Sequence, residues 1–174
     1  MASSAGADQP VWRELYSRSA GFRAEVPAEP RFEIEDERTL VGKVVHHHYI
    51  VEHSDARFDL ERLDLPTLAT AFFSPKRLLE RSKQGYVEEL DVLVDSVSEI
   101  ELQGHPGLRL LFRHRAGARG ETWFVLAGRH LYMVAAGPYR PEARATTVER
   151  VFSSFRICLE GEPACEPAAE LRSD

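Results

Sequence analysis

Three consecutive histidines, His46, His47 and His48, are the residues whose type and spacing best suit chemistry. They lie in a run from Thr39 to Glu52 whose side-chain alternation predicts a β-strand. Because residues two apart on a strand share one face, His46 and His48 can both reach one metal ion and form half of a site. The remaining ligands would come from elsewhere in the chain, and the candidates are His53, His114 and His130.

The same histidines also fit a purely structural role. On such a strand His47 falls on the more apolar face, together with Val45, Tyr49 and Val51. His46 and His48 would then face solvent and hold no metal. Both interpretations are hypotheses for the structure to address.

Arg109, Arg113 and Arg115 form a second group of candidate binding residues. They alternate with apolar residues in the run 107–115, so we expect them to project from one face of a strand. Guanidinium groups placed together in this way can bind an anion or the acidic face of a partner protein. The alternative is that these charges only keep an exposed strand face in solution.

The usual signatures of an enzyme are missing from the sequence. It contains no Gly-x-Ser-x-Gly element, no phosphate-binding loop, no Cys-x-x-Cys pair and no dinucleotide fingerprint. We therefore expect no enzymatic activity and no cofactor.

Composition narrows the class of protein and of partner. The 174 residues are 43% hydrophobic and 29% charged, which is typical of a globular protein, and no apolar run approaches the length of a membrane span. The net charge is −6, of which residues 159–174 carry −4 (five acidic side chains and one arginine), which leaves −2 for the rest. A nearly neutral body without a basic excess argues against nucleic acid as a partner.

The first residues, MASSAGADQP, lack the cationic start and apolar core of an export signal. As written, the chain is predicted to be cytoplasmic, and it would be exported if a native signal peptide had been removed. Cys158 and Cys165 are close enough in sequence to close a small loop, but six intervening residues fit no common zinc motif. Unpaired thiols are the expected state of the two cysteines, and a disulfide is the alternative.

Residues 107–136 form the centre of the predicted fold. Their alternation predicts three successive strands, and Gly128 can supply the positive φ of the second hairpin. In the second and third strands both faces are apolar, so each face needs cover from helices or from another layer.

The other segments are expected to supply hairpins and cover. The predicted strands are 11–16, 22–26, 39–52, 57–63 and 92–102, although 57–63 also fits a short helix. A helix is predicted from Ser74-Pro75 to Leu90, a second helix from Pro141, and a last short strand at 155–157. At this length we expect a single domain over 11–158, with a flexible segment at 1–10 and a loosely ordered acidic tail at 159–174.

Several short motifs follow one another along the chain. They are an early Gly21-Phe22 followed by Pro27, the turn Gly104-His105-Pro106-Gly107, the hairpin from Leu126 to Tyr132 and the closing run from Phe152 to Phe155. Their order resembles that of the PsbP-like family of small bacterial proteins. The resemblance covers about residues 12–157 and implies an antiparallel sheet with helices on both faces. The family has no common catalytic residues, and many of its bacterial members are exported, unlike the prediction from this N-terminus.

Together these observations predict an α+β protein with an antiparallel β-sheet of about six to eight strands built from hairpins and flanked by helices on both faces. The predicted function is a non-catalytic protein-binding or adaptor module, with another protein as partner. The alternative is a small-ligand or metal-binding protein that uses His46 and His48.

Overall fold

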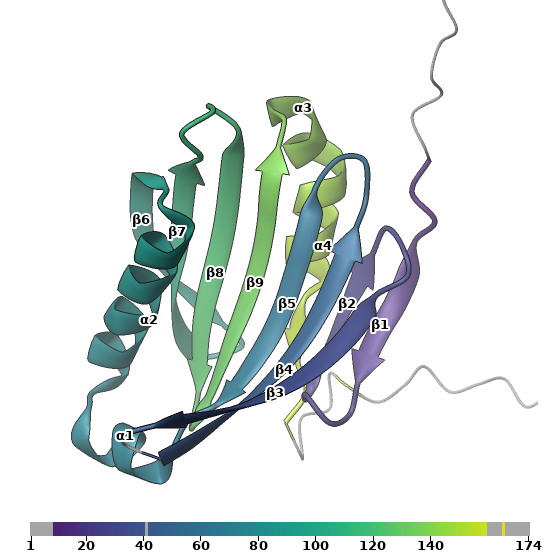
Figure 1. Cartoon of the computed structure of the whole chain (residues 1–174). Coiled ribbons are helices and arrows are strands. Elements are labelled where there is room, and N and C mark those ends of the chain that lie inside the picture. The colour runs from purple at the N-terminus through teal and green to yellow at the C-terminus, as the bar shows by residue number, and fades with distance from the viewer. Residues whose placement is uncertain (1–8, 41, 160–164, 166–174) are drawn as a thin grey trace, which may run out of the picture.

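The computed structural model describes residues 9–40, 42–159 and 165. Ten strands form two antiparallel sheets. The larger sheet has seven strands in the order β3-β4-β5-β9-β8-β7-β6, and the smaller has three in the order β1-β2-β10 (Figure 1). The strands are β1 (Arg13–Ser17), β2 (Phe22–Val26), β3 (Arg31–Thr39), β4 (Gly42–Glu52), β5 (Arg57–Asp64), β6 (Leu93–Leu102), β7 (His105–Arg113), β8 (Arg119–Ala127), β9 (His130–Tyr139) and β10 (Arg156–Ile157).

The helical elements are α1 (Thr67–Phe72), α2 (Pro75–Leu90), α3 (Pro141–Ala143), the π-helical turn η1 (Arg144–Val148) and α4 (Glu149–Ser154). The predicted start of α2 is confirmed, because the Ser74 side chain accepts a hydrogen bond from the Arg77 backbone N–H and Pro75 occupies the first helical position. The helix predicted from Pro141 and the short strand at its end are also present.

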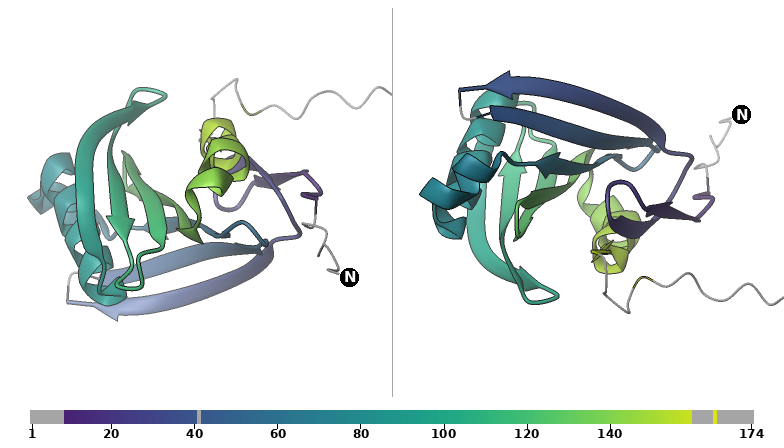
Figure 2. Two further views of the ribbon diagram at one scale, coloured as in Figure 1. Left: turned by 90° about the horizontal axis from the view of Figure 1, so that it is seen from above. Right: turned by 90° about the horizontal axis from the view of Figure 1, so that it is seen from below.

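The central strands of the large sheet are covered on both faces, as the apolar alternation of residues 107–136 predicts. On one face, Leu79 of α2 packs with Leu110, Phe112, Phe124 and other residues of β7–β9. On the other face, α4 and the small sheet enclose a second cluster that includes Phe22, Phe155 and Tyr132. Figure 2 shows these layers from the two ends of the molecule. The predicted α+β class with two-sided cover is thus confirmed.

The meander β7-β8-β9 has the predicted hairpins. Gly128 has φ +61° in the link between β8 and β9, which is the left-handed conformation expected there. Gly120 has a different requirement, because a Cβ built on it would lie 2.2 Å from Cζ of the buried Phe112 ring.

Two elements were not predicted from the sequence. β3 is exposed along nearly all its length and rich in charge, so no buried face produces the alternation that marks a strand. The predicted strand 39–52 is also too long at its start, because Thr39 ends β3 and the hairpin turn follows it. α1 is a helix of six residues with one buried residue, Ala69, so its sequence shows no clear helical periodicity.

The expectation of two unpaired thiols is wrong. Cys158 and Cys165 form a disulfide, with their Cα atoms 5.3 Å apart. Seven residues of sequence separation are enough to bring the two Cα atoms within bonding range. Cys158 directly follows β10, and its own N–H donates a hydrogen bond to the Gly21 carbonyl. Most of the residues assigned to a flexible start and a loosely ordered tail lie outside the described part of the chain. Among the described residues, no helix is long and apolar enough to cross a bilayer.

Two glycine substitutions should have opposite effects on stability. Gly120→Ala would force a Cβ into the Phe112 ring, and we expect it to lower the free energy of unfolding by about 1–3 kcal/mol. Gly85→Ala adds a Cβ in open space within α2, and we expect a gain of roughly 0.5–1 kcal/mol from helix propensity. Urea unfolding followed by circular dichroism measures both, and a Gly120→Ala protein as stable as the wild type would contradict the packing described.

Candidate functional site

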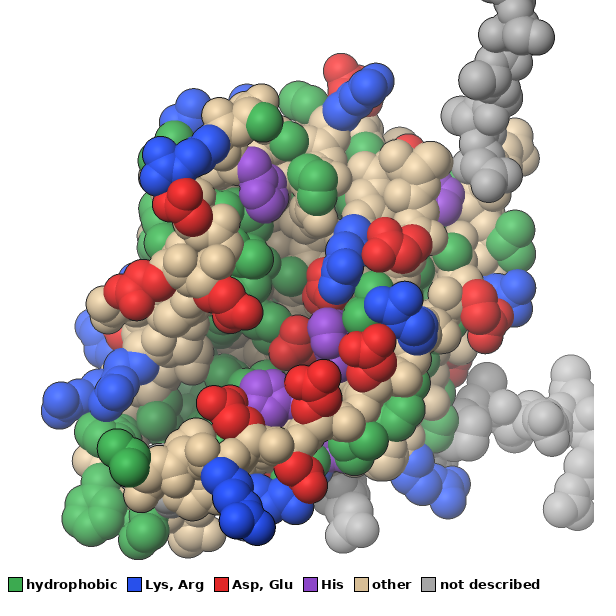
Figure 3. Space-filling view, viewed as in Figure 1, with side chains coloured by type: hydrophobic (Ala, Val, Ile, Leu, Met, Phe, Trp, Pro, Cys, Tyr) green, Lys and Arg blue, Asp and Glu red, His purple; other side chains and the backbone are tan. Residues whose placement is uncertain are grey.

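A groove of about 890 Å³ lies between α2 and the strands β3–β5. The large sheet curves so that β3 and β4 turn toward the side on which α2 lies (Figure 2). α2 itself packs on β7 and β8, which leaves the β4–β5 part of the same face open. Figure 3 shows the resulting hollow, with acidic and histidine side chains along one side of it.

The floor of the groove is apolar, and its wall on the side of the sheet is charged. Phe112, Phe124, Leu131, Met133 and Ala135 belong to the floor. The lining also holds five carboxylates against two guanidinium groups, with the carboxylates on Glu35, Glu37, Asp59, Glu61 and Glu89 and the guanidiniums on Arg57 and Arg81.

Strand alternation explains why charged side chains face the groove. Phe58 and Leu60 of β5 are fully buried in the core beneath the sheet. Asp59 and Glu61 therefore point to the opposite face, into the groove. His46 and His48 of β4 share that face and do not point to open solvent.

His48, Asp59 and Glu61 form the tightest polar cluster in the groove. His48 Nε2 lies 2.8 Å from Asp59 Oδ1 and 3.3 Å from Glu61 Oε1. One ligand atom from each of the three residues lies within 4.8 Å of the others, a geometry that can hold a metal ion. Arg57 is a competitor for Asp59, since its Nε and Nη2 both donate to that carboxylate, at 3.0 and 2.8 Å.

Burial and charge act in opposite directions on this cluster. Burial alone lowers the pKa of His48, but the hydrogen bond to Asp59 and the charge of Glu61 outweigh it, so the pKa is raised above 6.5. Burial likewise acts to raise the pKa of Asp59, and its bonds to His48 and Arg57 reverse this effect and lower it. The pKa of Glu61 is raised, because burial there outweighs the attraction of His48.

The other histidines are placed apart from this cluster. His46 Nε2 lies 3.5 Å from Glu37 Oε2 in the groove. His114 lines the groove, and His53 Nδ1 lies 3.7 Å from Asp55. The candidate ligands predicted from the sequence are His53, His114 and His130, and none of them belongs to the cluster of His48, Asp59 and Glu61.

Sequence reasoning missed these carboxylates, although the predicted hairpin contained the signal. Glu52 pairs with Arg57 next to the turn. Counting four residues back from Glu52 and four forward from Arg57 reaches His48 and Glu61, which are cross-strand partners. The hairpin register would therefore have placed them together.

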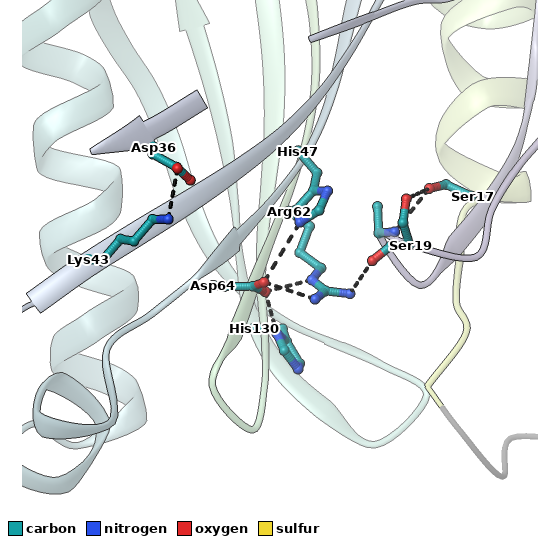
Figure 4. A network of polar contacts seen from close by, with 9 residues as sticks. Ser17, Ser19, Asp36, Lys43, His47, Arg62, Asp64 and His130 are labelled. Atoms are coloured by element: carbon teal, nitrogen blue, oxygen red, sulfur yellow. Dashed lines mark hydrogen bonds and ion pairs between the residues drawn. The ribbon is translucent and has the colours of Figure 1, made fainter. Parts of the chain in front are cut away.

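His47 points to the opposite face of the sheet and belongs to a different network. Its Nε2 lies 3.7 Å from Asp64, which also binds Arg62 and His130, each at 2.7 Å (Figure 4). Arg62 in turn donates to the Ser19 carbonyl at 3.0 Å and so ties the large sheet to the loop between β1 and β2. Burial, together with the charge of Arg62, lowers the pKa of His47. These contacts serve the packing of the two sheets.

The three candidate arginines do not converge on one site. Arg109 binds the buried Glu121 at 2.7 Å, a carboxylate that also accepts from Arg144 and Trp123. Arg113 binds Asp95, and Arg115, in the turn after β7, binds Asp91 at the end of α2. Each guanidinium already has a carboxylate partner, so an anion would have to compete with that partner.

Comparison with known proteins identifies the fold and nothing narrower. No family model matches the chain, and neither does any curated protein. Among solved structures, the chain is similar to the solution structure of cyanobacterial PsbP from Synechocystis sp. PCC 6803, with a TM-score of 0.55 and 12% identity over 90% of this chain and 98% of that one. The chain therefore has a PsbP-like fold.

Two other solved structures are less similar to this chain. One is a protein from Bacteroides thetaiotaomicron, with a TM-score of 0.44 and 14% identity over 86% of this chain and 50% of that one. The other is a protein of unknown function from Pseudomonas aeruginosa, with a TM-score of 0.38 and 13% identity over 77% of this chain and 86% of that one.

The raised pKa of His48 depends on Asp59, which a substitution can test. Because the folded-state pKa lies above 6.5, charged His48 stabilises the fold fully below that pH, and this contribution is lost as pH rises through the folded pKa. In Asp59→Asn the burial remains and the strongest opposing contact is lost, so we expect the pKa of His48 to fall below 6.5. Titration of the imidazole signals by NMR measures the shift.

Glu35→Gln is the matched control, because it neutralises a carboxylate of the same groove that is not among the contacts controlling His48. It should leave the titration of His48 nearly unchanged. Equal pKa values for His48 in the wild type and in Asp59→Asn would refute the role given to Asp59.

Proposed function

We propose that this protein is a non-catalytic binding module that holds a basic, partly apolar segment of another protein in the groove between α2 and β3–β5. The observation that carries the proposal is the pairing of an apolar floor with a carboxylate-rich wall. Five carboxylates against two arginines leave an excess of three negative charges when the histidines are neutral. Lysine or arginine side chains would meet this wall while neighbouring apolar side chains pack on the floor.

The dimensions of the groove agree with a ligand of this kind. Its volume of about 890 Å³ lies toward the upper end of the range of roughly 300–1,000 Å³ that is usual for ligand sites. Glu35, Glu37 and Glu89 are exposed and so are available to a partner. Asp59 and Glu61 are already engaged with His48 and supply a fixed negative background.

The arrangement of the groove also favours binding over catalysis. A nucleophile would need a hydroxyl or thiol within reach of a base such as His48. Ser82 lines the groove, but its hydroxyl donates to the Leu78 carbonyl at 2.9 Å. The Tyr86 hydroxyl accepts from Thr122 at 3.0 Å, and burial raises the pKa of Tyr86 to about 12. Neither hydroxyl is activated by His48.

Selection of peptides from a random displayed library tests the proposal. We expect the wild-type protein to enrich peptides that combine lysine or arginine with leucine or phenylalanine. The double variant Glu37→Lys, Glu89→Lys places two cations at the groove, and we expect it to bind the selected peptides at least about tenfold more weakly. Peptide affinities are measured by fluorescence anisotropy.

A matched control changes the net charge equally but outside the groove. The double variant Glu14→Lys, Glu101→Lys replaces exposed carboxylates on β1 and β6 and should retain wild-type affinity. No enrichment by the wild type, or equal losses in the two double variants, would argue against the groove as the binding site.

A second candidate function is the binding of a divalent metal ion by His48, Asp59 and Glu61. The specific observation in its favour is the approach of one nitrogen and two carboxylate oxygens to within 4.8 Å of one another, at a position that opens to the groove. One imidazole and two carboxylates form a ligand set that suits Zn²⁺, with the groove side left for water or another ligand. Binding would require Asp59 to exchange its contact with Arg57 for the metal.

Isothermal titration with zinc chloride tests this site. We expect saturable binding by the wild type and at least about tenfold weaker binding by His48→Ala, since one of three ligands is lost. His46→Ala is the matched comparison, because His46 lies two residues earlier on the same face of β4 and outside the cluster, and we expect it to bind nearly as the wild type does. No heat from the wild type would eliminate the metal site.

A further inference from the structure

Three exposed apolar side chains, two of which are the most exposed large apolar side chains of the described residues, lie at one end of the molecule outside the core. Leu40 is 108% exposed, Phe72 77% and Leu68 57%. Leu68 and Phe72 are four residues apart and share one face of α1, while Ala69 packs inward. We name these three residues the apolar tip.

The three side chains belong to one end of the molecule, although Leu40 comes from a hairpin turn and the other two come from α1. Leu40 lies in the turn between β3 and β4, and Pro66 directly precedes α1. A Cβ built on Gly42 would lie 3.0 Å from Cβ of Pro66, so the hairpin turn contacts the start of α1. Figure 1 shows α1 beside the β3–β4 turn at the lower end of the molecule, and Figure 3 shows hydrophobic side chains protruding there.

Three arginines lie close in the chain to the residues of the apolar tip. Arg77 and Arg81 of α2 lie over the ring of Phe73, with their guanidinium carbons 5.1 and 5.3 Å from its centroid. Arg38 lies at the hairpin end. Among the described residues, no carboxylate forms an ion pair with any of these three arginines. Lys43 and Lys76 add to the basic border, but they are paired with Asp36 and Glu99.

We propose that the apolar tip docks this protein on an anionic lipid surface, with Leu40, Leu68 and Phe72 entering the interface and the surrounding arginines contacting lipid headgroups. A protruding apolar group bordered by cations is the arrangement that binds such a surface, because burial of the apolar side chains and attraction of the cations act together. A second copy of the chain fits less well, since self-association through the apolar tip would bring the arginines of both copies together.

The proposed docking does not require a ligand in the groove, although Arg81 borders both surfaces. The whole chain carries −6, so attraction to an anionic surface requires a local group of cations, and the proposal assigns this role to the arginines near the tip. Its strength should therefore fall with salt, while the apolar contribution remains.

Co-sedimentation with lipid vesicles tests the proposal on the full chain. We expect the wild type to bind vesicles that contain about 30% phosphatidylserine in phosphatidylcholine, and to bind pure phosphatidylcholine far less. The double variant Leu68→Ser, Phe72→Ser should reduce the partition coefficient at least about tenfold. Val11→Ser, a change at another highly exposed apolar residue outside the tip, should leave it unchanged.

A second pair of substitutions tests the cations separately. Arg38→Gln with Arg77→Gln should weaken binding to the phosphatidylserine vesicles by about fivefold for each charge and leave binding to phosphatidylcholine unaffected. Circular dichroism of each variant ensures that the comparison is between folded proteins. Wild type that fails to sediment with the anionic vesicles, or a loss that is the same for Val11→Ser as for the tip variant, would overturn the proposal. So would a dimer of the wild type in light scattering that the tip variant abolishes, because the tip would then serve self-association.

Discussion

The constraint on which the structure depends is the burial of both faces of β8 and β9. Each of these strands carries apolar side chains on its two sides, so the chain has to provide two separate layers of cover. The small sheet and α4 cover one face of these strands. On the other face α2 is the principal cover, and it packs on β7 and β8. The curved sheet extends beyond the reach of a single helix, and the uncovered part, over β4 and β5, becomes the groove.

This origin of the groove explains why its chemistry changes from floor to wall. Near α2 the strands still contribute to a core, and Phe124 and Leu131 are buried there. Toward β3 the cover ends, and the same face of the sheet carries Asp59, Glu61 and the histidines. The bonds of Asp59 to His48 and Arg57 lower the pKa of this carboxyl in spite of its burial and so favour its ionised form.

The sequence predicts those helices and strands whose apolar residues recur regularly because one or both faces are buried. β7, β8, β9 and α2 bury regular faces, and their predictions are confirmed. β3 escapes prediction because the sheet edge exposes both its sides, so Phe32 and Ile34 mark no buried face. For the site, the histidine run identifies the strand correctly, but the partners of His48 depend on the cross-strand register of β4 and β5. Arg109, Arg113 and Arg115 do not form a common binding site, because each guanidinium pairs with a different carboxylate. Neighbouring strands supply two of these carboxylates, and the end of α2 supplies the third.

The charged side chains of α2 are distributed in the opposite way to the one that would stabilise the helix dipole. A helix is stabilised by acidic side chains in its first turn and basic side chains in its last turn, by about 0.3–1 kcal/mol each. α2 has neither, and it carries Lys76 and Arg77 at its start and Glu88 and Glu89 near its end. Departures from such local preferences are expected where the surface residues serve a function such as binding. The start of α2 borders the apolar tip and its end borders the groove, so the reversed charges match the two surfaces that we propose for binding.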